Sequence, residues 1–184
     1  MTVISVVMPT YNRLPRLQRV LKAFEKQTFS TANFEVIVVS DGSLDGTNDY
    51  LNSFRPSFPF VLIIQENQGP AAARNKGIDK ASGDYILFVD DDVVPQPNLI
   101  YEHMRFHEMH ENSVVVGPML TPADFDMQPW VSWEQAMLVK QYAAMAEGQW
   151  APTARQFFTG NASLLRSTLI DAGGLILPFK ELKI

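Results

Sequence analysis

The stretch Tyr85-Ile86-Leu87-Phe88-Val89-Asp90-Asp91-Asp92 joins five apolar or aromatic residues directly to three carboxylates. A short run of this composition is typical of a strand buried on both faces. Side chains alternate along an extended chain, so we expect Asp90 and Asp92 to point the same way and Asp91 to point oppositely. Three adjacent carboxylates repel one another, so the fold must compensate them. Two convergent carboxylates suit Mg²⁺, with a substrate phosphate completing its shell, and a solvated acidic turn is the structural alternative.

The bulk composition limits the class of protein. The 184 residues, of which 46% are hydrophobic and 19% charged, indicate one folded domain or a domain plus part of another. The net charge of −5 argues against a nucleic-acid-binding surface, which is normally basic. The chain has no cysteine, which excludes disulfides, thiolate metal sites and cysteine nucleophiles and fits a reducing compartment.

The N-terminal residues 1–5 lack a basic leader and enter a short apolar run, so we expect a first strand and not a signal peptide. No stretch reaches the roughly 20 apolar residues that a membrane helix needs. We therefore expect a cytoplasmic location and leave open peripheral contact with the cytoplasmic face of a membrane.

Strands and helices are predicted to alternate along the first half of the chain. Apolar runs predict strands at 3–8, 34–39, 60–64 and 85–89, and helical spacing predicts helices at 14–24, 47–54 and 71–79. This order predicts an α/β fold, a mostly parallel sheet with helices on both faces. Ligands bind such sheets beyond the carboxyl ends of the strands, where residues 10–13, 41, 66–69 and 90–92 fall. We expect these four polar loops to converge on one site.

The second half of the chain gives weaker signals. We predict a helix at 99–109, a short strand at 114–117, a helix at 130–145 and a strand within 157–166. His103 and His107 are four residues apart and share a helix face, and His107-Glu108-Met109-His110 has one residue too few between its histidines for a zinc metalloprotease motif. We interpret the three histidines as part of a solvated helix face. Trp130 and Trp133 fall at helical spacing with a methionine at 137, which predicts core packing, with sugar stacking or membrane-surface contact as alternatives.

Several short motifs occur in a fixed order along the chain. They are Val7-Met8-Pro9-Thr10-Tyr11-Asn12-Arg13, Ser40-Asp41-Gly42-Ser43 with Asp45-Gly46-Thr47, Asn67-Gln68-Gly69-Pro70 through Gly77, Gly83 through Asp92, Gly160-Asn161-Ala162-Ser163 and Ala172-Gly173-Gly174. Each motif alone is weak, but the ordered set resembles the family 2 glycosyltransferases, nucleotide-sugar-dependent enzymes of the Rossmann-like GT-A fold. The resemblance extends over about residues 3–177. It implies a nucleotide-sugar-binding region at 1–120 and an acceptor-side region at 121–184, within one continuous domain.

The resemblance also implies roles for individual residues. Asp41 is expected to accept a hydrogen bond from the base, Arg74 to face the nucleotide, Asp90 to hold the ribose, and Asp92, with Asp90, to ligate Mn²⁺ or Mg²⁺. The residues implied in nucleotide binding are Pro9, Thr10, Tyr11, Asn12, Arg13, Asp41, Asn67, Gly69, Arg74, Asp90 and Asp91. The structural alternatives are a turn carboxylate for Asp41, a surface charge for Arg74, and loop-backbone hydrogen bonds for Asn12 and Asn67.

The chain departs from the family pattern near its C-terminus. Relatives place an acidic pair, the source of the general base, shortly after the Gly-Gly landmark. Here Glu181 is the only acid after Gly174, it has no adjacent aspartate, and lysines lie on both sides of it. We therefore expect a chain truncated near this motif, with Glu181 as the one candidate base.

The implied activity is inverting, metal-dependent transfer of a sugar from a nucleoside-diphosphate donor to an acceptor hydroxyl in glycan biosynthesis. A UDP-sugar is the favoured donor, and the acceptor is a saccharide, a lipid-linked sugar or a protein. One alternative is a donor-binding or assembly module without transfer activity. A sugar-phosphate nucleotidyltransferase is another, although the Gly-rich basic signature expected after its first strand is missing. A nicotinamide dehydrogenase is disfavoured because no Gly-x-Gly-x-x-Gly follows that strand.

Overall fold

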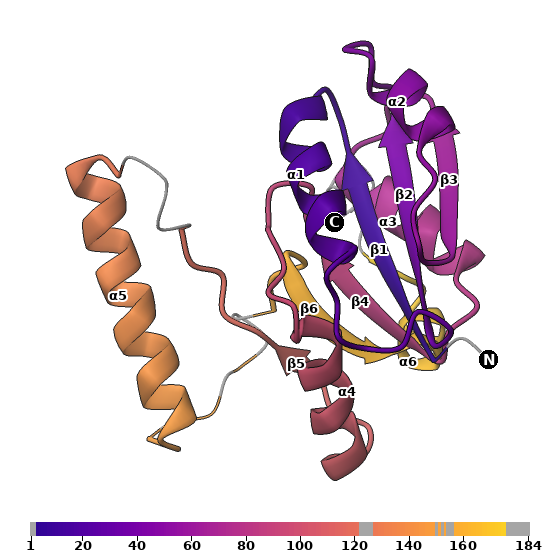
Figure 1. The fold of residues 1–184 in the computed structure, drawn as a ribbon. Helices are drawn as coiled ribbons and strands as arrows, with labels where there is room; N and C mark the ends of the chain where they lie inside the picture. The colour runs from indigo at the N-terminus through magenta and orange to yellow at the C-terminus, as the bar shows by residue number, and fades with distance from the viewer. Residues whose placement is uncertain (1–2, 122–126, 150, 152, 154–156, 176–184) are drawn as a thin grey trace, which may run out of the picture.

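The computed structural model describes residues 3–121, 127–149, 151, 153 and 157–175, in which six strands form one sheet of order β3-β2-β1-β4-β6-β5 (Figure 1). The strands are β1 (Ile4–Thr10), β2 (Phe34–Asp41), β3 (Phe60–Gln65), β4 (Tyr85–Val89), β5 (Val115–Val116) and β6 (Asn161–Leu165). The helices are α1 (Leu14–Phe24), α2 (Thr47–Ser53), α3 (Pro70–Lys80), α4 (Leu99–Met109), α5 (Pro129–Ala146) and α6 (Arg166–Asp171).

The sheet is parallel where the sequence predicts it to be. β1 pairs in parallel with β2 and with β4, and β2 pairs in parallel with β3, whereas β6 is antiparallel to both β4 and β5. The chain builds outward from β1 to β2 and β3, then crosses back through α3 to place β4 on the other side of β1. The reversal of strand order makes the carboxyl ends of β1 and β4 a topological switch point, the usual ligand position in open α/β sheets.

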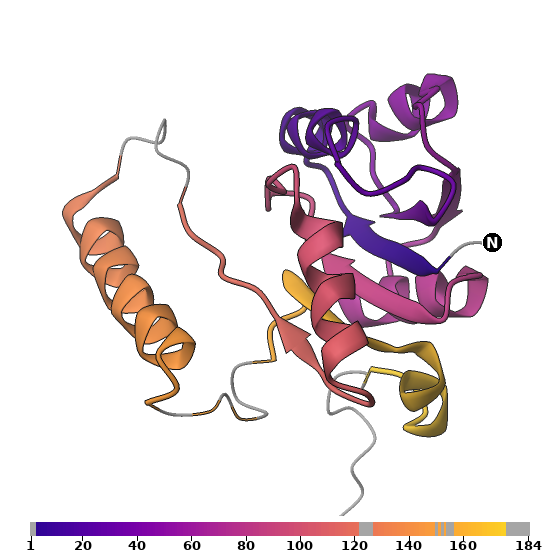
Figure 2. The ribbon, with the colours of Figure 1, turned by 60° about the horizontal axis from the view of Figure 1, so that its bottom comes forward.

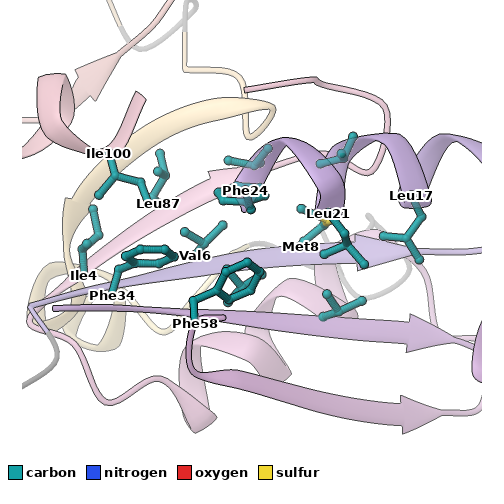
Figure 3. Packing of buried hydrophobic residues seen from close by; sticks show 14 of the residues in the cluster. Ile4, Val6, Met8, Leu17, Leu21, Phe24, Phe34, Phe58, Leu87 and Ile100 are labelled. Atoms are coloured by element: carbon teal, nitrogen blue, oxygen red, sulfur yellow. The ribbon is translucent and has the colours of Figure 1, made fainter. Parts of the chain in front are cut away.

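Helices cover both faces of the sheet, as expected. On one face, α1, α2 and α4 pack on strand residues such as Val6 and Leu87, with Phe24 and Phe34 among the largest fully buried side chains (Figure 3). On the other face, α3 and α6 pack on β-strand residues that include Val7 and Phe88. Figure 2 shows the two layers of helices separated by the twisted sheet. Full burial of each large apolar side chain contributes about 1.5–3 kcal/mol, so this core fixes where the strand ends lie.

A buried carboxylate joins three segments at the amino-terminal edge of the sheet, away from the strand ends that carry the polar loops. Glu35 Oε1 accepts hydrogen bonds from Ser5 Oγ at 2.6 Å, from Ser82 N at 2.7 Å and from Ser82 Oγ at 2.8 Å. Ser5 Oγ in turn accepts from the backbone N–H of Gly83 at 2.9 Å. The network ties β1, β2 and the turn before β4 together, and so sets the register at which β4 enters the sheet.

α5 corrects the prediction of core packing for its tryptophans. The helix forms as predicted, but in both ribbon views it lies apart from the sheet and its covering helices (Figures 1 and 2). None of its residues is buried, and Trp130 and Trp133 are 68% and 67% exposed. Two of its side chains accept hydrogen bonds from the preceding segment, Tyr142 Oη from Met119 N and Gln135 Oε1 from Thr121 N. Apolar spacing predicts a helix but does not say what the helix packs on.

Across the residues that the structure describes, the helices include none with the length and apolar character of a membrane span.

α4 corrects the prediction of a solvated histidine face. His103 and His107 are each only 3% exposed, because they share the inward face of α4 with Ile100 and Met104. Asn161 donates through Nδ2 to the carbonyl of Pro118, so its Oδ1 accepts from His103 Nε2 at 2.8 Å. The Nδ1 atom of His103 then accepts from the hydroxyl of Ser163 at 2.7 Å, and that hydroxyl accepts from His107 Nε2 at 2.7 Å. Neutral histidines therefore fasten α4 to β6.

Lowering the pH from 7 to 5.5 should destabilise the fold through His103. Burial lowers the pKa of His103 from 6.5 to about 4, and its neighbour His107, whose pKa burial also lowers, opposes a second charge. The unfolded chain takes up this proton near pH 6.5 while the folded chain does not until about pH 4, so the free energy of unfolding falls as pH decreases across this interval. The expected loss at pH 5.5 from His103 is on the order of 1 kcal/mol.

Urea denaturation at several pH values checks this prediction. The variant His103→Gln should show a flatter dependence of unfolding free energy on pH between 7 and 5.5 than the unaltered chain. His110→Gln, which removes an exposed histidine from the end of the same helix, serves as the control. If the unfolding free energy of His103→Gln depends on pH as that of the unaltered chain does, His103 is not the source of this pH dependence.

Candidate functional site

A cavity of about 350 Å³ lies at the carboxyl ends of the parallel strands. It is formed by the loops that follow β1, β2, β3 and β4, the four loops that the alternation of strands and helices predicts to converge. The lining residues are Pro9, Thr10, Tyr11, Arg13, Asp41, Asn67, Gly69, Pro70, Arg74, Asp90 and Asp91. The volume is at the lower end of the range for small-molecule pockets, and the wall mixes carboxylates, guanidinium groups and one exposed aromatic ring.

Asp41 closes the inner end of the cavity at the tip of β2. Asp41 is 3% exposed, and its carboxylate accepts hydrogen bonds from Gln65 Nε2 at 2.7 Å and from the backbone N–H groups of Gln68 and Gly69, both at 2.9 Å. These bonds hold the loop after β3 against β2. A carboxylate can accept about four hydrogen bonds, so Asp41 keeps the capacity for one more from a ligand in the cavity.

The aspartate triplet lies beside the β1 loop, and its position corrects the prediction that Asp90 and Asp92 point the same way and Asp91 points oppositely. β4 ends at Val89, so the three aspartates lie in the turn after the strand. The alternation of side chains along a strand therefore does not apply to them. Asp91 Oδ2 accepts from Thr10 Oγ1 at 2.7 Å, which ties the switch-point strands β1 and β4 together. Burial raises the pKa of Asp91, and the hydrogen bond from Thr10 and the charge of Arg13 counteract this shift.

Three arginines neutralise the three aspartates. Arg74 of α3 pairs with Asp90, Arg13 Nη1 lies 3.2 Å from Asp91 Oδ1 and 2.8 Å from Asp92 Oδ2, and Arg16 Nη1 lies 3.3 Å from the same Asp92 oxygen. The Arg74 side chain is only 12% exposed, and its Nε is buried without a hydrogen-bond partner. The three arginines therefore already compensate the repulsion among the three carboxylates, which a metal ion and a substrate phosphate were expected to compensate.

The loops after β1 and β2 brace each other. Asn12, which adopts a positive φ of 52°, accepts from Leu44 N through Oδ1 at 2.7 Å. Asp45 accepts from the first backbone N–H of α1, at Leu14, at 3.0 Å, and from Thr47 N and Oγ1 at the start of α2. Burial alone would raise the pKa of Asp45, but the hydrogen bonds from Leu14 and Thr47 lower it overall. These bonds hold the chain segment that presents Arg13 to the cavity.

The predicted site residues fall into three groups. Ten of the eleven implied in nucleotide binding line the cavity, and the eleventh, Asn12, instead bonds to a neighbouring loop. Asp92 does not line the cavity, but it forms an ion pair with Arg13, which does. Glu181 lies outside the described residues.

The sequence analysis assigned no site role to four residues that shape this site, Gln65, Pro70, Arg16 and Asp45, although Pro70 and Asp45 stand in its motifs. The register of β2 and β3 pairs Gln65 directly with Asp41, whereas the predicted strands 34–39 and 60–64 stop short of both residues. The remaining three depend on how loops and helix ends meet, which strand and helix periodicity does not specify.

The donor set suits a hard divalent cation that is shared with a ligand. Within the described ranges, no group of three or more histidine, aspartate or glutamate residues is arranged to hold a metal ion alone. Asp90 lines the cavity and Asp92 lies outside its lining, and their side chains are 34% and 36% exposed. Mg²⁺-type sites use one or two carboxylates and complete the shell with water and substrate phosphates, which matches this arrangement.

Comparison with known sequences gives matches over most of the chain. The sequence model described as Glycosyl transferase family 2 matches residues 5–173. An uncharacterized glycosyltransferase of Bacillus subtilis, YfnE, is 40% identical over 114 residues, which are 61% of this chain and 29% of the relative. The poly(ribitol-phosphate) beta-glucosyltransferase of Bacillus spizizenii is 31% identical over 119 residues, 63% of this chain and 19% of the relative. The chain therefore spans less than a third of the length of these curated relatives.

Solved structures share the fold. The S. aureus TarS fragment 1–349 in complex with UDP superimposes with a TM-score of 0.74 at 22% identity, over 94% of this chain and 49% of the fragment. The mannosyltransferase PcManGT of Pyrobaculum calidifontis, in complex with GDP-Man and Mn²⁺, gives 0.76 at 22% identity, over 95% of this chain and 48% of that protein. This chain therefore shares the fold of these glycosyltransferases.

Proposed function

Because the chain belongs to glycosyl transferase family 2, we propose that it carries the donor site of an inverting, metal-dependent glycosyltransferase that uses a UDP-sugar. The observation that supports this most is a cavity at the strand ends whose lining includes Asp41, Arg13, Arg74, Asp90 and Asp91. A nucleoside diphosphate needs acceptors for its base, cations for its phosphates and a rigid rim, and the cavity supplies each of these.

Asp41 and Tyr11 form the nucleoside end of the proposed site. The remaining hydrogen-bond capacity of Asp41 suits the imide N–H of uracil, and the bonds from Gln65 and two backbone N–H groups hold its carboxylate in place. Tyr11 is 47% exposed and lines the same cavity, which suits contact with a flat base.

Arg13, Arg74 and the start of α3 form the phosphate end. α3 begins at Pro70 directly after Gly69, and helix N-termini favour anions through their free N–H groups and dipole. The guanidinium of Arg74 borders the cavity, and its buried Nε has no hydrogen-bond partner among the described residues. A diphosphate bound here would receive charge-assisted hydrogen bonds from two sides.

Asp92, with Asp90, is the proposed holder of Mn²⁺ or Mg²⁺. Bound there, the ion would act as a Lewis acid that stabilises the negative charge developing on the departing nucleoside diphosphate. The Mn²⁺ reported with PcManGT supports a divalent ion, and the nucleotides reported with TarS and PcManGT support UDP or GDP donors. The acceptor hydroxyl belongs, in this proposal, to a saccharide, a lipid-linked sugar or a protein, and residues 121–184 form part of its side.

A nucleotide panel tests the proposal. Calorimetric titrations of UDP, GDP, ADP, UTP and NAD⁺, each with Mn²⁺, should show a diphosphate of uridine binding at least about tenfold more tightly than ADP, or about 1.4 kcal/mol. Tighter binding of GDP than of UDP would indicate a GDP-sugar donor and would leave the proposed glycosyltransferase function in place. Equal binding of ADP and NAD⁺, or no diphosphate binding, would overturn it, and release of pyrophosphate from UTP with a sugar phosphate would favour a nucleotidyltransferase.

A further inference from the structure

Two arginines of one helix end converge on a single carboxylate oxygen of the aspartate triplet. Arg13 Nη1 and Arg16 Nη1 lie 2.8 Å and 3.3 Å from Asp92 Oδ2. Arg13 is the residue before α1 and Arg16 follows three positions later, a spacing that places two side chains on the same side of a helix. The oxygen that the proposed donor site assigns to a divalent cation is therefore shared by two protein cations.

The ion pairs of Arg13 and Arg16 with Asp92 can exchange partners and contribute little to the stability of the fold. The Arg13 and Arg16 side chains are 47% and 63% exposed, and their pairs with Asp92 contribute little to folding because water and salt screen them. Arg13 also pairs with Asp91, whose side chain is only 6% exposed. Arg74 and Asp90 form the contrasting pair, with the Arg74 side chain largely buried under the cavity. The inner pair is fixed by the fold, and the outer cluster is accessible to solvent.

We propose that Arg13 and Arg16 occupy the cation position on Asp92 until the donor arrives, and then turn to the donor's diphosphate. This inference rests on the proposed function and adds Arg16 to the donor site. A guanidinium and a divalent ion compete for Asp92 Oδ2, and both arginines repel a second cation beside it. A diphosphate offers the two guanidinium groups a new anionic partner, and Arg13 already lines the cavity that would contain it.

The exchange makes binding of cation and diphosphate mutually dependent, since each favours release of the arginines from Asp92. Such coupling is reciprocal, so the cation raises the affinity for diphosphate by the same factor as the diphosphate raises that for the cation. Direct contact between cation and phosphate would give coupling of the same sign. Binding of the cation alone is therefore the quantity that distinguishes the arginine exchange.

The test is electron paramagnetic resonance titration of Mn²⁺ without nucleotide. The double variant Arg13→Gln/Arg16→Gln should bind Mn²⁺ about tenfold more tightly than the unaltered chain, because two competing charges are gone. Lys22→Gln/Lys26→Gln removes the same charge from exposed positions at the other end of α1 and should stay within about twofold. Arg13→Lys/Arg16→Lys keeps both charges and should also stay near the unaltered value. Adding Asp92→Asn to the glutamine variant should remove the gain.

Three results would overturn the inference. They are an unchanged Mn²⁺ affinity in the glutamine variant, a gain in Mn²⁺ affinity that survives Asp92→Asn, or no Mn²⁺ binding by the unaltered chain or the glutamine variant up to about 10 mM. Circular dichroism and thermal unfolding establish that each variant is folded. Titration of UDP and GDP with Mn²⁺ provides a separate arm. If neither nucleotide binds the unaltered chain, the proposed donor site fails, while the Mn²⁺ titrations still decide whether the arginines compete for Asp92.

Discussion

Replacing Glu35 with leucine should lower the free energy of unfolding by about 3 kcal/mol. The substitution leaves Ser5 Oγ, Ser82 N and Ser82 Oγ without the acceptor that they share. Ser5 is fully buried, so water does not replace its lost partner. Because the network fixes the turn before β4, the strand that carries the aspartate triplet, urea denaturation should show the loss as a lower midpoint with an unchanged slope.

Glu35→Gln is the matched control for charge. Its side-chain oxygen still accepts hydrogen bonds, so we expect a smaller loss of about 1 kcal/mol. Glu108→Leu, at an exposed position on α4, should change the free energy of unfolding by no more than about 0.5 kcal/mol. A Glu35→Leu protein as stable as Glu108→Leu would show that the network does not support the fold.

Arg74→Gln should weaken UDP binding in the presence of Mn²⁺ by about thirtyfold, or 2 kcal/mol. The substitution removes the least exposed cation of the cavity wall and leaves the Asp90 carboxylate, which is one-third exposed, without its guanidinium partner. Both effects disfavour a diphosphate, since its phosphates lose a donor and meet an unpaired negative charge. We place the effect at the low end for a buried charge pair because Asp90 retains contact with water.

Calorimetry with two further variants separates charge from geometry. Arg74→Lys keeps the charge but loses the planar fork, so we expect an intermediate affinity. Arg105→Gln removes a guanidinium from α4 that pairs with Glu102, and its UDP affinity should match that of the unaltered chain. If Arg74→Gln binds UDP as well as Arg105→Gln does, Arg74 has no part in nucleotide binding.

The fold was predictable because the sequence pattern of its strands is clear. β1, β2 and β4 are mostly apolar and buried, with Ser5 and Glu35 as the polar interruptions of β1 and β2, and each strand leads into polar residues at the same edge. Parallel strands bring their carboxyl ends together, so the convergence of Asp41, Arg74 and the aspartate triplet followed from strand order. The roles of these residues toward a nucleotide or a metal ion remain predictions.

The partners of the charged residues could not be predicted in the same way. Asp90 and Asp91 lie beyond the end of β4, so the alternation that holds within a strand does not orient them. Which arginine reaches which carboxylate depends on where α1 and α3 begin and how tightly the loops brace each other. Asp45 illustrates the problem, because it caps α1 from a different loop, 31 residues away in the sequence.

The two wrong interpretations in the second half have different causes. Ile100, His103, Met104 and His107 fall on one face of α4, and that signal was present in the sequence. Counting histidine as a polar surface residue concealed it, although a neutral imidazole with hydrogen-bond partners is readily buried. For Trp130 and Trp133 no such signal exists, because α5 is apolar on several sides and periodicity does not identify a packing face.

The central claim is that the cavity binds a nucleoside diphosphate through a divalent cation held by Asp92. Calorimetric titration of UDP and GDP with and without Mn²⁺ tests it on the unaltered chain, on Asp92→Ala, and on Asp84→Ala, which removes an exposed acid at the opposite end of β4. We predict Mn²⁺-dependent binding that Asp92→Ala weakens at least about tenfold, or 1.4 kcal/mol, while Asp84→Ala leaves it unchanged. Equal Mn²⁺-dependent affinity in Asp92→Ala and the unaltered chain would contradict the claim.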